Sequence, residues 1–510
     1  MNEFLPISKK DIEERGWGQL DFIFVSGDAY VDHPSFGPAI LCRLLEKHGY
    51  KVGIIPQPDW HSTRDFDRLG RPRLGFLVSA GNMDSLLNKF TAAKKMRHQD
   101  AYSPGGRAGF RPERATIVYC NRLRELYPDC PIIIGGIEAS LRRLAHYDYW
   151  SNAVRRSILV DSQADLLIFG MGERALLEVA ADLQQGVDIG NIQDVQGTCY
   201  RVPGLDYVWD YLELPSYAEA AKDKRKFSEA FKLEYLEQDA IRGRKLAQQN
   251  DEWCVVQNPP ARPLSEAQMD EIYDLPYQRT WHPVYDKDGG IPAIQEVQFS
   301  LVSHRGCFGG CNFCAIISHE GRIIQRRSEA SLLREAKILT HQPGFKGYIH
   351  DVGGPTANFR RTSCDRQLDR GTCRGKACLS PVPCQNLVAD HSDYIRLLRK
   401  LRAVPGVKKV FVRSGVRFDY LLLANDDFLA ELCKYHISGQ LKIAPEHISD
   451  RVTRIMGKSN RSVYQRFAER FRKMNERLGL KQYLVPYFMS SHPGAKLEDA
   501  IELAEFIRDM

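Results

Sequence analysis

Three cysteines stand close together in a glycine-rich stretch of the chain, with the spacing C-x3-C-x2-C: Cys307, Cys311 and Cys314. Thiolates at this spacing can surround one face of a metal cluster, and a [4Fe–4S] cube usually takes four cysteine ligands. Three ligands would leave one iron open to a small molecule. The alternatives are a zinc site or three unrelated thiols. Structural zinc prefers paired C-x2-C or C-x2-H units and four ligands, so the spacing favours the iron–sulfur cluster.

A second group of cysteines lies in an insertion at residues 360–388, with the spacing C-x8-C-x4-C-x5-C: Cys364, Cys373, Cys378 and Cys384. Arg, Asp, Gly and Pro dominate the residues between them and predict no hydrophobic core. A metal held by all four thiolates would stabilise such a segment. Zinc and an auxiliary iron–sulfur cluster both fit, and four free thiols or two disulfides are the alternative.

The composition, 43% hydrophobic and 26% charged residues, is that of a soluble globular protein. No run of eighteen apolar residues predicts a membrane span, and the N-terminus has no signal-peptide core, so we expect a cytoplasmic protein without a membrane partner. Grouped cysteines in a reducing compartment indicate metal ligands.

The net charge of +7 is mild and spread out. A nucleic-acid module usually has a denser basic patch, so charge alone does not support an RNA substrate, which stays open.

The first domain is predicted over residues 1–205, where buried strands alternate with helices. Such alternation favours a doubly wound, flavodoxin-like α/β domain with a parallel sheet, whose ligands bind outside the carboxyl ends of the strands. The connection at residues 88–114 is long for a compact domain. We favour a mobile surface loop there over an anion site at Arg107 and Arg111. The predicted strands are 20–27, 50–55, 74–78, 131–136 and 165–170.

Residues 206–290 are predicted to connect two domains. A charged helical run extends from Leu214 to about Asn250, and a segment rich in proline and aromatic residues follows it.

The last domain is predicted at residues 291–510 as a partial TIM-like (β/α) barrel, with its site at the carboxyl ends of the strands. The loop of Cys307 directly follows the first strand. Only five βα pairs are visible, so we expect a truncated chain or one without its tail. The predicted strands are 297–303, 347–354, 409–415, 440–446 and 482–488.

The C-x3-C-x2-C motif, with the aromatic Phe313 before the third cysteine, resembles the signature of radical SAM enzymes. The residues from Arg305 to Cys311 resemble more narrowly the uncharacterised YgiQ-type radical SAM proteins, and the likeness begins as early as Val25. The resemblance implies a [4Fe–4S] cluster that binds S-adenosylmethionine (SAM) at its open iron. Reductive cleavage would then give a 5′-deoxyadenosyl radical that acts on an unknown substrate. It also implies an electron donor such as flavodoxin or ferredoxin.

The resemblance further implies cofactor contacts at the strand ends. The glycine pair after strand two takes the place of a Gly-Gly-Glu motif that meets the methionine amino group, but Pro355 replaces the glutamate. A cation after strand three would hold the methionine carboxylate, and a polar side chain after strand four would meet the ribose hydroxyls. No residue is assigned a catalytic role. The predicted cofactor-binding residues are Phe313, Gly353, Gly354, Arg413, Ser414, Arg417 and Glu446.

The first domain resembles the cobalamin-binding-type domain that precedes many radical SAM barrels. Members that ligate cobalt through the protein use D-x-H-x-x-G. The nearest match here, Asp32-His33 with Gly37, has the wrong spacing, which disfavours bound cobalamin and favours a scaffold or substrate-docking domain.

Two other functions remain open. Methylthio transfer to RNA or protein is one, since the order of domains is similar, and a second cluster with an open iron in the insertion would favour it. A non-catalytic iron–sulfur protein that binds nucleic acid or a partner is the other.

Overall fold

The computed structural model describes residues 3–510, which form two compact units. The first unit extends to Arg262 and also contains Leu275–Gln298, and the second comprises Pro263–Asp274 and Phe299–Met510. The chain therefore passes between the units three times. The boundaries predicted after residues 205 and 290 differ from this division. Among the helices of residues 3–510, none has the length and apolar character needed to cross a bilayer.

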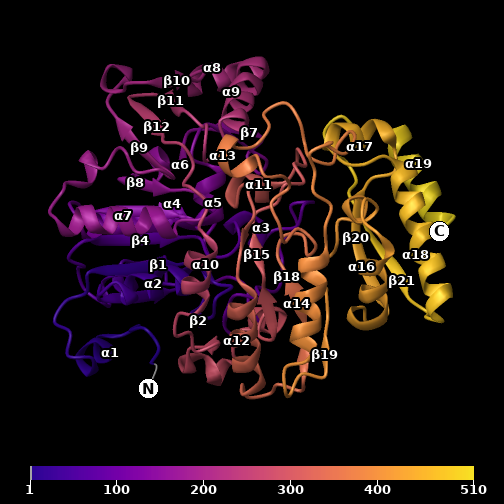
Figure 1. Cartoon of the computed structure of the whole chain (residues 1–510). Helices are drawn as coiled ribbons and strands as arrows, with labels where there is room; N and C mark the ends of the chain where they lie inside the picture. Colours follow the sequence, from indigo (N-terminus) through magenta and orange to yellow (C-terminus); the bar gives the residue numbers. More distant parts are fainter. Residues whose placement is uncertain (1–2) are drawn as a thin grey trace. The chain divides into compact units, whose positions relative to one another are not determined.

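The first unit is built on a nine-stranded sheet with the order β10-β11-β12-β9-β8-β5-β4-β1-β3 (Figure 1). Five neighbouring strands of this sheet, from β3 to β8, are all parallel. Their order corresponds to 2-1-3-4-5, the flavodoxin-like arrangement. The predicted doubly wound fold is confirmed. The five strands are β1 (Phe22–Ser26), β3 (Val52–Pro56), β4 (Gly75–Ser79), β5 (Ile132–Gly135) and β8 (Leu166–Ile168).

Alternate residues of the central strands enter two separate cores, one on each face of the sheet. Phe22 and Phe24 pack with α2 and α7, whereas Ile23 and Val25 pack with α4 and α6. Because successive side chains of a strand point to opposite faces, a strand buried on both sides reads as one continuous apolar run. The helices are α1 (Lys9–Glu14), α2 (Gly37–Lys47), α3 (Ser85–Lys89), α4 (Ala115–Leu126), α5 (Gly136–Leu141), α6 (Ile158–Asp161) and α7 (Glu173–Gln184).

Residues 206–262 do not form a separate connection, because three of their segments are strands of the same sheet. The predicted helical run to about Asn250 ends at Leu236, and the residues after it pair with β12. The polar β11 is nevertheless buried: Gln248 accepts a hydrogen bond from Ala145 N, and Asn250 accepts one from Ser157 N. Such tertiary pairing overrides local propensity. The elements are β9 (Thr198–Val202), β10 (Tyr211–Glu213), α8 (Tyr217–Lys222), α9 (Lys224–Leu236), β11 (Lys245–Asn250) and β12 (Trp253–Gln257).

Two short pairs of strands complete the first unit. The segment at β13 (Thr280–Trp281) pairs antiparallel with β2 (Val31–Asp32), and β6 (His146–Asp148) forms a hairpin with β7 (Ala153–Arg155).

The second unit is a partial barrel in which successive strands are parallel neighbours. β14 pairs with β18, β17 pairs with β19, a parallel bridge joins Val416 to Ile443, and β20 pairs with β21. One large hydrophobic core lies between these strands and the helices α12, α14, α16 and α18. This is the predicted TIM-like architecture. The strands are β14 (Ser300–Val302), β17 (Tyr348–Ile349), β18 (Asp351–Gly353), β19 (Lys409–Val410), β20 (Gln440–Glu446) and β21 (Tyr483–Phe488).

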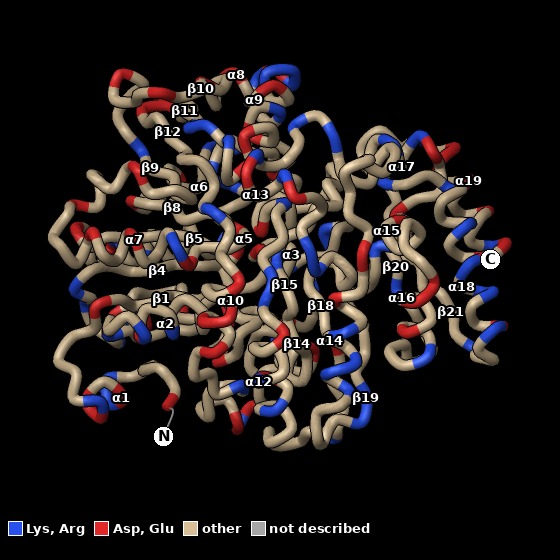
Figure 2. Tube along the Cα trace, viewed as in Figure 1, with Lys and Arg blue, Asp and Glu red and all other residues tan. Residues whose placement is uncertain are grey.

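Helices follow each barrel strand, and basic and acidic residues are interspersed along those on the surface (Figure 2). On α18, for example, Arg472 pairs with Glu469 at 2.6 Å. Helices of the second unit include α10 (Glu266–Tyr273), which precedes the first barrel strand, and α12 (Glu329–Thr340), α14 (Ser392–Arg402), α15 (Phe418–Leu421), α16 (Asp426–Glu431), α17 (Asp450–Met456), α18 (Arg461–Leu478) and α19 (Leu497–Arg508).

Helix α10 precedes the rest of the second unit by more than twenty residues but packs within it. Its Asp270 accepts hydrogen bonds from the backbone and hydroxyl of Ser328, the residue that caps α12. The Tyr273 ring lies under the guanidinium groups of Arg327 and Arg305, at 4.2 and 5.4 Å.

Loss of Arg43 is expected to destabilise the first unit. Its guanidinium pairs with Asp32, and both side chains are no more than 2% exposed. Arg43→Ala leaves a buried carboxylate without its cation, which typically costs about 3–5 kcal/mol. Urea unfolding followed by fluorescence measures the loss. In the control Lys10→Ala, which breaks the exposed Lys10–Glu14 pair, the change should stay within about 0.5 kcal/mol. Equal midpoints for the two variants would contradict the assigned role.

Candidate functional site

The loop that carries the first three cysteines is closed at its base by a short antiparallel pair of strands. β15 (His304–Arg305) leads into the loop, and β16 (Gln325–Arg326) leaves it. Gly306 has φ +85°, and a Cβ there would lie 2.3 Å from Ile323 O, so the sharp entry into the loop requires glycine. The loop then runs into the single-turn helix α11 (Ala315–His319), directly after Cys314.

The three thiols share one neighbourhood. Cys307 and Cys311 are buried and Cys314 is partly exposed. Burial raises the pKa of Cys307 to about 11, with a smaller opposing effect from the Gly309 backbone, and the charge of Cys311 raises it further. Burial likewise raises the pKa of Cys314, and Cys311 again adds to the increase. A metal bound by these thiols would displace their protons, so its binding would release protons.

A buried cation lies against the sulfurs. Arg417 Nη1 donates a hydrogen bond to Cys311 Sγ at 3.4 Å, and its Nε and Nη2 bond to the two carboxylate oxygens of Asp419 at 2.8 and 3.1 Å. Burial opposes the charge of Arg417, but Asp419 and then Cys311 and Cys307 hold the pKa of its guanidinium above its usual value. Cys307 has a polar neighbour of its own, since its Sγ lies 3.8 Å from the hydroxyl of Thr356.

A second buried ion pair lies at the end of β20. Lys458 Nζ is 3.7 Å from Glu446 Oε1, and burial lowers the pKa of Lys458 and raises that of Glu446. Oε2 of Glu446 is buried and has no hydrogen-bond partner within residues 3–510. The backbone of Glu446 is left-handed, with φ +69°, which strains a residue with a Cβ. Strain and an unsatisfied carboxylate at a strand end are typical of a binding site.

The glycine pair after β18 is required by close packing inside the chain. A Cβ on Gly353 would lie 2.0 Å from Ser414 Oγ, and one on Gly354 would lie 2.5 Å from His304 O. Asp351 accepts hydrogen bonds from the backbone N–H groups of Arg413 and Ser414, at 2.6 and 3.1 Å. The ends of the second and third strands are therefore joined, while the side chains of Arg413 and Ser414 remain exposed.

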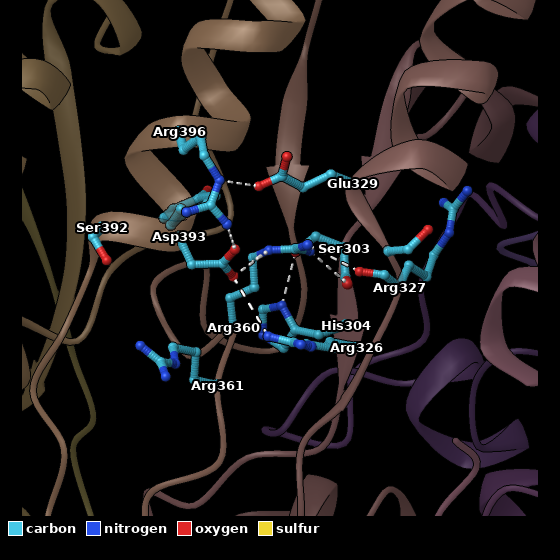
Figure 3. A network of polar contacts seen from close by, with 12 residues as sticks. Ser303, His304, Arg326, Arg327, Glu329, Arg360, Arg361, Ser392, Asp393 and Arg396 are labelled. Atoms are coloured by element: carbon cyan, nitrogen blue, oxygen red, sulfur yellow. Dashed lines mark hydrogen bonds and ion pairs between the residues drawn. The ribbon is translucent and has the colours of Figure 1, made fainter. Parts of the chain in front are cut away.

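Figure 3 shows a polar network that anchors the base of the cysteine loop. The buried Arg360 donates to Ser303 O at 3.2 Å, to Arg327 O at 2.9 Å and to Asp393 Oδ2 at 3.1 Å. His304 contacts the hydroxyl of Ser303 at 2.8 Å. Burial, with a smaller effect of Arg360, lowers the pKa of His304 to about 3, so this ring is neutral at physiological pH.

The insertion packs against the first cysteine loop. Arg322 donates to the backbone oxygens of Cys373 and Lys376 at 3.0 and 3.2 Å, and a Cβ on Gly310 would lie 3.1 Å from Ala377 Cβ. The insertion also buries Leu379 in a small hydrophobic cluster with Cys307 and Phe308, and it contains α13 (Gln367–Arg370).

The sulfurs of Cys364, Cys373 and Cys378 lie near one another. Burial raises the pKa of Cys378, and the charges of Cys364 and Cys373 raise it further. Cys384 N donates to Cys378 O at 2.9 Å. Among residues 3–510, the cysteines of the first loop included, no three His, Cys, Asp or Glu side chains are arranged to hold a single metal ion. Both cysteine sites remain predictions.

The structure thus gathers the first three cysteines with Arg417 and, through Lys458, with Glu446. Phe313 contacts His492 edge to face, with ring centroids 5.9 Å apart.

Sequence reasoning missed Asp419, Lys458 and Asp351. The Arg-x-Asp spacing from Arg417 to Asp419 could have indicated a buried pair, but nothing local marks Lys458, which approaches from after α17.

In the first unit, the carboxyl edge of the sheet is occupied by the chain's own side chains. Arg111 is only 4% exposed, which overturns its placement on a mobile surface loop, and it pairs with Asp28 at 2.6 Å. A Cβ on Gly81 would lie 2.2 Å from Asp28 Oδ1. Arg107 pairs with Asp288 at 2.6 Å. Neither arginine is an uncommitted anion-binding cation.

Comparison with known proteins assigns the family. Residues 4–300 match the model described as radical SAM N-terminal, and residues 301–507 match that of the radical SAM superfamily. The chain belongs to the radical SAM superfamily. UPF0313 proteins of Clostridium botulinum (strain ATCC 19397 / Type A) and Clostridium perfringens (strain 13 / Type A) are both 57% identical to it, over 509 and 511 residues. These alignments cover all of this chain and 79% and 77% of the relatives. The predicted membership is confirmed.

Two solved structures share the fold. The radical S-adenosylmethionine methyltransferase TsrM from Kitasatospora setae is 14% identical, with a TM-score of 0.50, covering 96% of this chain and 71% of that one. The cobalamin-dependent S-adenosylmethionine radical enzyme OxsB is 11% identical, with a TM-score of 0.51, covering 98% of this chain and 53% of that one. At these identities the likeness concerns the fold alone.

Removal of the Asp351 carboxylate should loosen the loop after the third barrel strand. Asp351→Ala deprives the N–H groups of Arg413 and Ser414 of their acceptor, and each lost bond of this exposed kind costs about 0.5–1.5 kcal/mol. Hydrogen exchange followed by mass spectrometry should show faster exchange at residues 413–415. Asp351→Asn keeps an acceptor oxygen and should retain most of the protection. Identical exchange in wild type and Asp351→Ala would refute this role.

Proposed function

We propose that Cys307, Cys311 and Cys314 hold a [4Fe–4S] cluster with which the protein reductively cleaves SAM, and that the resulting radical acts on an unidentified substrate. The observation that carries the proposal is the group of three thiols on one tight loop, with a fixed guanidinium against one sulfur. Thiols crowded in a buried site are costly as thiolates unless metal and cation balance their charge. When bound, the cluster supplies one electron to the sulfonium, and carbon–sulfur cleavage gives methionine and a 5′-deoxyadenosyl radical.

The chain's own residues would bind and orient SAM. The unsatisfied oxygen of Glu446 is an acceptor suited to a ribose hydroxyl. The exposed Arg413, on a loop fixed by Asp351, offers a cation for the methionine carboxylate, whereas the hydroxyl of the neighbouring Ser414 bonds to Asp351. Arg417 is less suited to that role than its sequence position suggested, because its guanidinium is engaged by Asp419 and Cys311. Phe313, Gly353 and Gly354 remain proposed cofactor-binding residues.

We propose that the first unit acts without cobalamin, although OxsB is described as cobalamin-dependent. Asp32 is engaged with Arg43, and the Asp28–Arg111 pair occupies the strand ends where such a domain would bind a ligand. This arrangement supports a scaffold or substrate-docking role. A flavodoxin or ferredoxin would donate the electron.

Methylthio transfer to RNA or protein is the second candidate. It is favoured by one observation, the packing of a four-cysteine insertion against the first cysteine loop. An auxiliary cluster there would favour this chemistry, whereas zinc would favour a structural role for the insertion.

Anaerobically reconstituted protein should form 5′-deoxyadenosine from SAM after reduction with dithionite. Cys311→Ala removes one of three ligands and should reduce the yield at least a hundredfold. Cys130→Ala, a buried thiol of the first unit, should retain activity. Equal yields from wild type and Cys311→Ala would contradict the proposal. A cluster-bearing wild type that forms no 5′-deoxyadenosine would favour a non-catalytic iron–sulfur protein.

Metal analysis of Cys373→Ala tests the insertion. Loss of one ligand from a four-thiolate site should remove about one zinc per chain, or the iron of an auxiliary cluster, while the iron held by Cys307, Cys311 and Cys314 is retained. Inductively coupled plasma mass spectrometry distinguishes these metals and also reports cobalt. A metal content equal to that of the wild type would exclude the second site.

A further inference from the structure

Arg417 is not a mobile surface cation but a fixed one. Two parallel hydrogen bonds join it to Asp419, whose carboxylate also accepts hydrogen bonds from the Ser459 hydroxyl and the Tyr420 backbone. The backbone N–H of Arg417 donates to Asn358 Oδ1 at 2.8 Å. A bidentate pair whose members are both held elsewhere defines the direction of Nη1, the guanidinium nitrogen that the pair does not use. Nη1 donates to Cys311 Sγ.

The cysteine loop is shaped to admit this guanidinium. A Cβ on Gly309 would lie 2.6 Å from Arg417 Nη1 and 3.3 Å from Cys307 Sγ. The missing side chain therefore lets one positive charge approach the sulfurs of both Cys307 and Cys311. Gly309 is therefore required because a side chain there would keep the guanidinium away from the sulfurs. Gly310 is required for a different reason, since its backbone has φ +64°.

A fixed cation beside these sulfurs would change the reduction potential of a bound cluster, in addition to any effect on metal binding. The potential of an iron–sulfur cluster depends on its net charge, on hydrogen bonds to its sulfurs and on its exposure to solvent. One electron passes from the donor, dithionite in vitro or a ferredoxin-type protein, to the cluster, with no bond made or broken. The added negative charge is stabilised by a nearby positive charge, and the low dielectric of a buried site strengthens this effect.

We propose that Arg417, oriented by Asp419 and admitted by Gly309, is a positioning residue that raises the reduction potential of the cluster held by Cys311. The inference rests on the proposed function, since it assumes the cluster. In this assignment Arg417 helps the cluster to accept an electron, and other groups recognise the methionine carboxylate.

The test is an anaerobic redox titration of the full chain with dithionite, followed by electron paramagnetic resonance, with iron content measured on the same samples. Arg417→Gln should lower the midpoint potential so that the reduced-to-oxidised ratio at a given potential falls at least tenfold, or 59 mV for a one-electron couple. Arg417→Lys keeps a charge and should show a smaller decrease. The matched control Arg472→Gln removes an exposed arginine that also pairs with a glutamate, and it should leave the potential unchanged.

Gly309→Ala provides a second test that retains every charged residue. Its Cβ would displace the guanidinium, so the potential should fall in the same direction as in Arg417→Gln. This variant decides the matter if Arg417→Gln fails to retain iron. An unchanged or raised potential in the iron-loaded variants overturns the inference, as does an equal decrease in Arg472→Gln. A wild type without an iron–sulfur signal would instead overturn the proposed function, so the two failures are distinguishable.

Discussion

The candidate site depends on one electrostatic constraint: several sulfur atoms are buried together, and their negative charge must be balanced. Burial alone favours protonated thiols, as the raised pKa values of Cys307 and Cys314 show. The chain supplies only part of the balance, through Arg417 and hydrogen-bond donors of the loop. Under the proposed function, a bound cluster would supply the rest once the thiols are deprotonated. Asp419 anchors Arg417, and Arg360 anchors the base of the loop, so the guanidinium and the cysteine sulfurs keep fixed positions relative to one another.

The same constraint explains the closeness of the packing around the loop. Gly306, Gly309 and Gly310 each face an atom of another segment at a distance that leaves little room for a side chain. Phe308 of the loop stacks on Phe359, the residue before the insertion, at 3.7 Å between centroids, and Leu379 of the insertion packs in the same cluster. A site that must exclude water while holding charge is expected to be covered in this way, since a low dielectric strengthens every interaction inside it.

Local patterns in the sequence predicted much of this structure. The spacing of Cys307, Cys311 and Cys314 is a property of one loop, and the continuous apolar runs of β1, β4 and β5 reflect burial on both faces. The strand β11 was missed because its Lys-Leu-Ala-Gln-Gln-Asn sequence is stabilised by partners more than ninety residues away. Lys458 was missed for a related reason, since its contact with Glu446 is made by the fold and leaves no local signal. Asp419 differs, because its partner Arg417 is only two residues away and the Arg-x-Asp spacing was overlooked.

The placement of α10 has a consequence for any attempt to divide the protein. This helix lies in the sequence between two segments of the first unit, yet Asp270 caps the start of α12 and Tyr273 supports the guanidinium groups of Arg305 and Arg327. A fragment that starts after residue 290 would lose this support directly beneath the entry to the cysteine loop. The two halves are therefore not independent modules that recombination could exchange at one junction, and the segment from Pro263 to Asp274 would have to be inherited with the barrel.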